Sequence, residues 1–88
     1  MILAIDQGTS GTTALAVDAA AQVAGRGYAT VHQQYPRPGW VEHDAAQIWD
    51  SVCTASRAAL AQAGGPSLAA IGVANQRETA VAWNARTG

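Results

Sequence analysis

A polar stretch near the N-terminus constrains the fold of this chain more than any other feature of its sequence. The stretch covers residues 6–13 and reads Asp-Gln-Gly-Thr-Ser-Gly-Thr-Thr. The apolar run 2–5 precedes it, and the apolar run 14–17 follows it. Both runs have the length and composition of β-strands, so the polar stretch is predicted to be the turn between two adjacent strands.

The composition of this turn indicates more than a simple connection. Glycine allows a backbone to approach a ligand closely, and successive N–H groups in a turn can form a concave anion-binding site. Hydroxyl side chains can donate further hydrogen bonds to phosphate oxygens. We therefore predict a phosphate-binding turn, with contacts from Gly8, Thr9, Ser10, Gly11 and Thr12.

Asp6 stands at the beginning of the turn. A carboxylate does not bind phosphate favourably, because like charges repel, but it can hold a divalent cation such as Mg²⁺ through water. The alternative is a hydroxyl-rich turn that satisfies only its own backbone, since Ser, Thr, Gly and Asp are also the commonest turn formers. Composition alone leaves both interpretations open.

Three strands are expected in the first part of the chain. They cover residues 2–6, 13–18 and about 22–33, and their short connections predict an antiparallel meander. Gly25 and Gly27 interrupt the third strand, where a bulge or bend is expected. Two prolines then end this strand, because proline lacks the N–H group that pairs strands.

A helix is expected next, with Asp44 as its N-cap. Asp44 and Gln47 form a capping-box pattern, in which Asp44 accepts from the N–H of Gln47 and Gln47 reaches back. Helical spacing predicts one buried apolar stripe, and Gly64-Gly65-Pro66 predicts the end of the helix. The predicted stripe consists of Ile48, Trp49, Val52, Cys53, Leu60 and Ala63.

The apolar run 68–74 predicts a buried strand, and residues 79–83 predict a further strand. A helix between the third and fourth strands implies a right-handed return to a parallel position in the sheet. The predicted fold class is therefore α/β: a three-stranded antiparallel meander, a helix, a parallel strand and one more strand.

Composition bounds the possible partners and location. The chain has 88 residues, enough for one small domain, and is 49% hydrophobic with only 12% charged residues. We therefore expect apolar surfaces covered by the rest of a longer polypeptide or, second, by an oligomer partner. A net charge of −1 and scattered arginines argue against nucleic acid as a partner. One cysteine, no secretory signal and no apolar run of membrane-spanning length favour a cytoplasmic location.

Three segments together resemble the FGGY family of carbohydrate kinases. They are residues 4–10 (Ala-Ile-Asp-Gln-Gly-Thr-Ser), 38–44 (Pro-Gly-Trp-Val-Glu-His-Asp) and 71–79 (Ile-Gly-Val-Ala-Asn-Gln-Arg-Glu-Thr). The last segment is most similar to the members that phosphorylate glycerol. The resemblance covers nearly all of residues 1–88 and implies the N-terminal part of the family's N-terminal domain. The implied fold is the actin-like ATPase, or ribonuclease-H-like, fold.

The resemblance also implies roles for particular residues. Thr9, Ser10 and Gly11 would line the phosphates of ATP, with Asp6 facing Mg²⁺. Arg77 and Glu78 would hold the hydroxyls of glycerol or a similar polyol. A guanidinium can donate to one hydroxyl oxygen while a carboxylate accepts from another, although an adjacent Arg–Glu pair can also be a simple exposed ion pair.

Two departures from the family pattern stand out. Thr13 occupies a position where many glycerol-phosphorylating members have an arginine near the phosphates, so one positive charge is missing. The chain is also several times shorter than family members, and their general base is expected beyond residue 88. We expect a full-length, homo-oligomeric enzyme that makes sn-glycerol 3-phosphate, and an inactive fragment. Alternatives are a kinase for another sugar or polyol and a non-catalytic, nucleotide-binding actin-like module.

Overall fold

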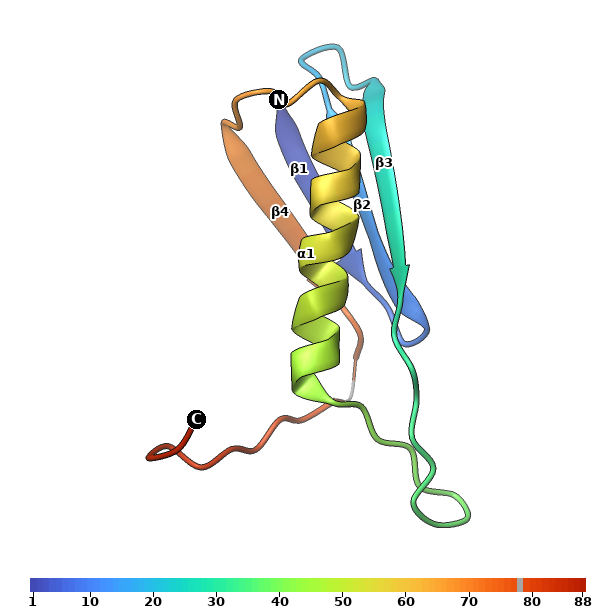
Figure 1. Ribbon diagram of the computed structural model, residues 1–88. Coiled ribbons are helices and arrows are strands. Elements are labelled where there is room, and N and C mark those ends of the chain that lie inside the picture. The colour runs from blue at the N-terminus through green and yellow to red at the C-terminus, as the bar shows by residue number, and fades with distance from the viewer. Residues whose placement is uncertain (78) are drawn as a thin grey trace.

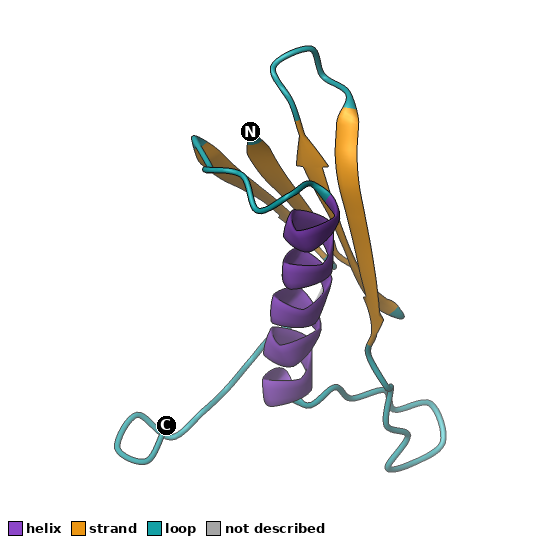
Figure 2. Cartoon of the chain, turned by 45° about the horizontal axis from the view of Figure 1, so that its top comes forward, coloured by secondary structure: helices purple, strands orange, loops and turns teal. Residues whose placement is uncertain are grey.

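The computed structural model describes residues 1–77 and 79–88 and shows one sheet with a helix on one face (Figures 1 and 2). The elements are β1 (Ile2–Gln7), β2 (Gly11–Val17), β3 (Val23–Thr30), α1 (Ala45–Gln62) and β4 (Ala70–Asn75). The strands lie in the order β3-β2-β1-β4. The predicted meander is confirmed, because β1 pairs antiparallel with β2, and β2 pairs antiparallel with β3.

The predicted parallel return is also confirmed, but the strand is not buried as predicted, because every residue of β4 is exposed. Strand β4 pairs parallel with β1, with Ile2 opposite Ala70 and Gln7 opposite Asn75. The carboxyl ends of β1 and β4 therefore lie at the same edge of the sheet. The turn between β1 and β2 begins at this edge, so residues that follow β4 are brought close to it.

The turn itself is shorter than predicted. Strand β1 extends through Gln7 and β2 begins at Gly11, so only residues 8–10 connect them. Gln7 pairs with Thr12 in the ladder, and the Gly8 N–H donates to the Gly11 carbonyl at 2.8 Å. Gly11 and Thr12 are therefore strand residues. Glycine and threonine are common in turns, but here both residues pair with strands and belong to β2.

The glycines of β3 serve helix packing. The predicted bulge is present, because the pairing of β3 with β2 passes over Ala24, which lies between Val23 and Gly25. Strand β3 ends at Thr30, however, and not near residue 33. Gly25 and Gly27 are buried beneath α1. A Cβ atom at Gly27 would lie 2.9 Å from the Cβ of Ala58 and would also clash with the backbone of Ala55. The missing side chains allow the helix to pack closely against the strand.

The face that α1 buries differs from the predicted stripe. Ser51, Ala55 and Ala59 are buried against β2 and β3, whereas Trp49 is 65% exposed. The other members of the predicted stripe are only partly buried: Ile48, Val52, Cys53, Leu60 and Ala63. The stripe prediction is thus only partly right: Val52 and Leu60 pack against the core cluster, but the fully buried face consists of small side chains, which the glycines of β3 accept. The larger side chains turn toward the uncovered part of the sheet.

Both ends of α1 follow the sequence signals. The Asp44 carboxylate accepts from the N–H of Ala46 at 2.9 Å, so Asp44 is the N-cap as predicted, although its partner is not Gln47. At the other end, the Gly65 N–H donates to the Leu60 carbonyl at 2.8 Å. Gly64 and Gly65 both have positive φ angles, 86° and 66°. This glycine-dependent geometry satisfies the last carbonyls of the helix and ends it.

The strand predicted over residues 79–83 is not present in the part of the chain that the structure describes. These residues follow β4 as an extended segment without strand pairing, and Trp83 is 72% exposed. An extended pattern becomes a strand only where a neighbouring strand supplies hydrogen-bond partners. Within the described residues, no helix is both long and apolar enough to cross a membrane.

Candidate functional site

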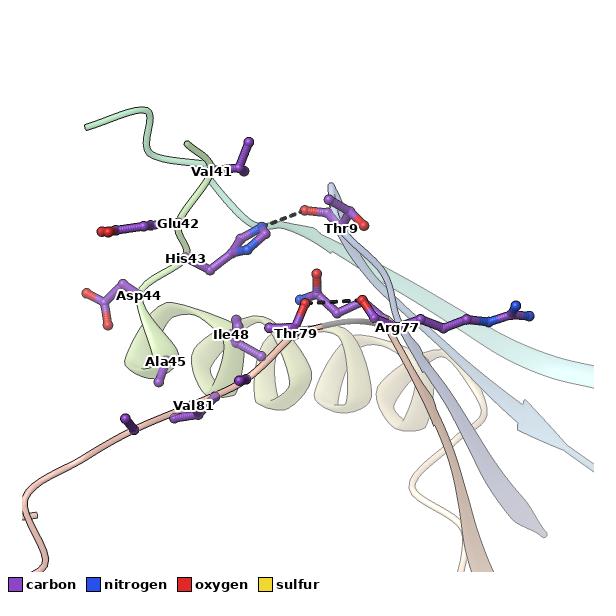
Figure 3. Close-up of a pocket in the computed structure, with 13 residues that line it drawn as sticks. Thr9, Val41, Glu42, His43, Asp44, Ala45, Ile48, Arg77, Thr79 and Val81 are labelled. Atoms are coloured by element: carbon purple, nitrogen blue, oxygen red, sulfur yellow. Dashed lines mark hydrogen bonds between the residues drawn. The ribbon is translucent and has the colours of Figure 1, made fainter. Parts of the chain in front are cut away.

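A cavity of about 760 Å³ lies at the carboxyl edge of the sheet (Figure 3). Three parts of the chain line it: the β1–β2 turn, the segment that leads into α1 together with the first turn of that helix, and the residues that follow β4. The lining residues are Thr9, Val41, Glu42, His43, Asp44, Ala45, Ile48, Gln76, Arg77, Thr79, Ala80, Val81 and Ala82. Thr9 and Arg77, which the sequence assigned to two different ligands, thus line one common cavity.

The carbonyl groups of the β1–β2 turn all accept hydrogen bonds from the protein. The Gly8 carbonyl accepts from the side-chain amide of Gln7 at 2.8 Å. The Ser10 carbonyl accepts from the Val31 N–H at 3.0 Å, and the Gly11 carbonyl accepts from the Gly8 N–H. These bonds hold the acceptors of the turn within the protein.

The remaining carbonyl of the turn, that of Thr9, has two side-chain donors. His43 Nε2 lies 2.9 Å from this oxygen, and Gln33 Nε2 lies 3.3 Å from it. Because a carbonyl can only accept, His43 carries a proton on Nε2 in this contact. Figure 3 shows the imidazole reaching from the segment before α1 to the turn. The sequence alone assigned no role to His43, and its place in the segment 38–44 was the available signal.

The N–H groups of the turn, unlike its carbonyl groups, are not all hydrogen-bonded to the protein. Among the described residues, the N–H groups of Thr9 and Ser10 have no protein acceptor. Both residues are exposed. The turn therefore offers donors to solvent while its acceptors are occupied. Such an arrangement suits an anion.

Gly11 and Thr12 lie apart from the exposed part of the turn. Thr12 is fully buried under α1, and its hydroxyl lies 2.7 Å from the hydroxyl of Ser51. Gly11 is also buried, with the Tyr28 hydroxyl packed where a side chain would be. The structure thus brings Gly8, Thr9 and Ser10 together at the cavity edge. It argues against a phosphate contact by the Thr12 side chain.

Asp6 faces a different cavity. It is exposed on the sheet face opposite α1, where a groove of about 570 Å³ is also lined by Thr13 and Arg26. No group of three or more His, Cys, Asp or Glu side chains could hold a metal ion within the described residues. A single exposed carboxylate next to the turn is compatible with a Mg²⁺ ion that is held mainly by phosphates and water.

Arg77 follows the end of β4 and is exposed. In Figure 3 its guanidinium extends away from the side chains of Glu42 and His43. The residue before Arg77 ties the end of β4 to the end of β1, because the Gln76 side chain donates to the Gln7 side-chain oxygen at 3.1 Å. Glu78, the predicted partner of Arg77 in polyol binding, lies outside the described residues.

Comparison with known proteins identifies relatives along the whole chain. Residues 1–88 match the N-terminal domain of the FGGY family of carbohydrate kinases. Glycerol kinases from Bordetella pertussis and Sinorhizobium fredii are 51% and 49% identical over 99% of this chain. The chain spans only 18% of the length of each of these relatives.

Solved structures support the same relationship. A xyloylose kinase from Brucella ovis matches with a TM-score of 0.79 and 34% identity, over 84% of this chain and 16% of that one. A glycerol kinase from Plasmodium falciparum, determined with ADP, matches with a TM-score of 0.74 and 28% identity, over 89% of this chain and 16% of that one. These kinases share the predicted actin-like fold. The chain belongs to the FGGY family of carbohydrate kinases, and its residues 1–88 match the N-terminal domain of that family.

Proposed function

We propose that the full-length protein containing this chain transfers the γ-phosphoryl group of ATP to glycerol and forms sn-glycerol 3-phosphate. The observation that carries the proposal is the common cavity of Thr9 and Arg77 at the carboxyl edge of the sheet. Ligands in open α/β sheets bind at this edge. Relatives at about half identity over nearly the whole chain are glycerol kinases, which favours glycerol as the substrate.

The β1–β2 turn binds the nucleotide phosphates in this proposal. Within residues 1–77 and 79–88, the N–H groups of Thr9 and Ser10 meet no protein acceptor, and both residues are exposed. Gly8 allows close approach of the backbone. The buried Thr12 supports the turn from beneath through its contact with Ser51. Mg²⁺, when bound, neutralises charge that develops on the phosphates, and Asp6 is the residue of this chain that would hold it through water.

Arg77 binds the polyol in this proposal by donating to hydroxyl oxygens, and Glu78 accepts from a neighbouring hydroxyl. Phosphoryl transfer also needs groups on the other side of the reacting atoms. The general base is expected beyond residue 88, so the chain alone is expected to be inactive. A cytoplasmic homo-oligomer is part of the same proposal.

The test is the substitution Arg77→Ala in the full-length protein. We expect the KM for glycerol to rise at least about tenfold, since a charge-assisted hydrogen bond is lost, while the KM for ATP changes little. Arg57→Ala is the matched control, because Arg57 is exposed on α1 away from the cavity. An unchanged KM for glycerol in the Arg77→Ala variant would exclude Arg77 from the polyol site.

A second substrate is favoured by one observation. The xyloylose kinase from Brucella ovis shares the fold of this chain over 84% of this chain's length. We expect the pocket walls that set substrate size to lie outside the 88 residues. Turnover of the full-length protein with a panel of polyols and ketoses decides between the two: glycerol as the preferred substrate supports the proposal, and a preferred pentulose replaces it.

A further inference from the structure

The hydrogen bonds around the Thr9 carbonyl assign a role to His43 beyond the binding residues themselves. This oxygen accepts from His43 Nε2 at 2.9 Å and from Gln33 Nε2 at 3.3 Å. His43 is half-buried and comes from the segment before α1, thirty-four positions away along the chain. The contact therefore joins the turn to the base of the helix, and it is the shorter of the two bonds.

The Thr9 carbonyl belongs to the same peptide unit as the Ser10 N–H. A peptide unit is planar and trans, so its carbonyl oxygen and its N–H hydrogen point in opposite directions. A donor that fixes the Thr9 oxygen on one side also fixes the Ser10 N–H on the other. Turn peptides without such a partner can rotate, and rotation here would expose an acceptor in place of a donor.

We propose that His43 is a positioning residue, which orients the Thr9–Ser10 peptide so that the Ser10 N–H donates to a nucleotide phosphate. Gln33 supports the same carbonyl from the segment after β3. This inference rests on the proposed function, because it assumes that the turn binds the phosphates. His43 itself touches no phosphate in this arrangement, since its donor atom is occupied by the Thr9 oxygen.

The experiment compares three variants of the full-length protein by calorimetric titration with MgADP and by steady-state kinetics. His43→Phe keeps a ring but removes the donor. His43→Gln keeps an N–H donor on a side chain of similar reach. His32→Phe is the matched control, because His32 is exposed and does not line the cavity that His43 and Thr9 share.

We expect His43→Phe to weaken MgADP binding at least about fivefold, as the loss of one ordered donor implies. The KM for glycerol should change by a smaller factor than the affinity for MgADP, because the lost donor bonds the β1–β2 turn and not the polyol. His43→Gln should recover most of the nucleotide affinity, and His32→Phe should match wild type. If His43→Phe does not fold, His43→Leu removes the same donor with a smaller side chain, and a wild-type affinity for MgADP in His43→Leu overturns the inference.

The outcomes separate this inference from the proposed function. Wild-type protein that neither binds MgADP nor phosphorylates a polyol contradicts the proposed function. Active wild-type protein with an equally active and tightly binding His43→Phe variant overturns only the role of His43. An equal loss of MgADP affinity in His43→Phe and His43→Gln also overturns it, because the donor would then not be the property that matters.

Discussion

Ala21 has a φ angle of 60°, the one positive φ among the described non-glycine residues. It lies in the turn between β2 and β3, where the Asp18 carboxylate accepts from the N–H groups of Ala20 and Gln22. A Cβ atom in this left-handed conformation costs about 1–2 kcal/mol. Part of this strain disappears with glycine, although glycine also increases the entropy of the unfolded chain.

We therefore expect Ala21→Gly to stabilise the full-length protein by up to about 1 kcal/mol. The measurement is the midpoint of thermal unfolding, Tm, which should rise. Ala20→Gly is the control, because Ala20 is exposed in the same turn without a positive φ. A similar rise in Tm for Ala20→Gly would show that strain at Ala21 is not the cause.

Thr12 gives a second prediction at the residue scale. Its hydroxyl is buried against that of Ser51, so Thr12→Val should lower stability by about 1 kcal/mol and leave the KM for ATP nearly unchanged. Thermal unfolding and ATP kinetics of the full-length protein check both parts. A large rise in the KM for ATP with an unchanged Tm would restore Thr12 to the phosphate site.

The sequence predicts a phosphate-binding role for residues 8–12 but does not show which of these residues are accessible. All five residues have the composition of a phosphate-binding turn, yet strand pairing buries Gly11 and Thr12 and leaves Thr9 and Ser10 exposed. The register of a hairpin decides this difference, and a change of one residue reverses every side chain. His43 was missed for a related reason, because its contact with Thr9 depends on tertiary structure.

At the scale of elements, the contact between α1 and β3 depends on glycine. A methyl group at Gly27 would meet the backbone of Ala55 and the Cβ of Ala58. Gly27→Ala should therefore move the helix and destabilise the protein by about 1–3 kcal/mol, as overpacking does. Gly72→Ala in β4 is the control, since nothing lies within 4 Å of a Cβ atom there. Equal Tm values for the two variants would contradict this account of helix packing.

Helical spacing predicts that a segment is amphipathic, but several faces of α1 carry apolar residues. The larger ones, such as Trp49 and Val52, dominate the pattern, whereas the buried face consists of Ser51, Ala55 and Ala59. The glycines of β3 select this small-residue face. Because the sequence does not show which strand lies under the helix, the prediction favoured the larger side chains. The helix limits, in contrast, were set by local signals at Asp44 and Gly64 and were predicted well.

At the scale of the whole molecule, an apolar groove remains open between α1 and β4. Trp49, Ile71 and Val73 contribute to it, and the last two are 59% and 68% exposed. We expect the isolated 88-residue chain to self-associate through such surfaces. Sedimentation velocity over a range of concentrations measures this, and a monodisperse monomer at every concentration would contradict it.

The topology was the most predictable property at this scale. Short connections imply the meander, and the right-handed return through a helix places β4 parallel to β1, as observed. This placement alone brings the ends of β1 and β4 to one edge, and with them Thr9 and Arg77. The strand expected over residues 79–83 was wrong because strand formation depends on a partner strand, which the sequence of the segment does not specify.

The central claim is that one edge of the sheet binds both the nucleotide and the polyol. A crystal structure of the full-length protein with MgADP and glycerol tests it most directly. The account predicts phosphate oxygens about 3 Å from the N–H groups of Thr9 and Ser10, and glycerol hydroxyls beside Arg77. Phosphates bound away from the β1–β2 turn, or glycerol bound away from the cavity that Thr9 and Arg77 share, would contradict it.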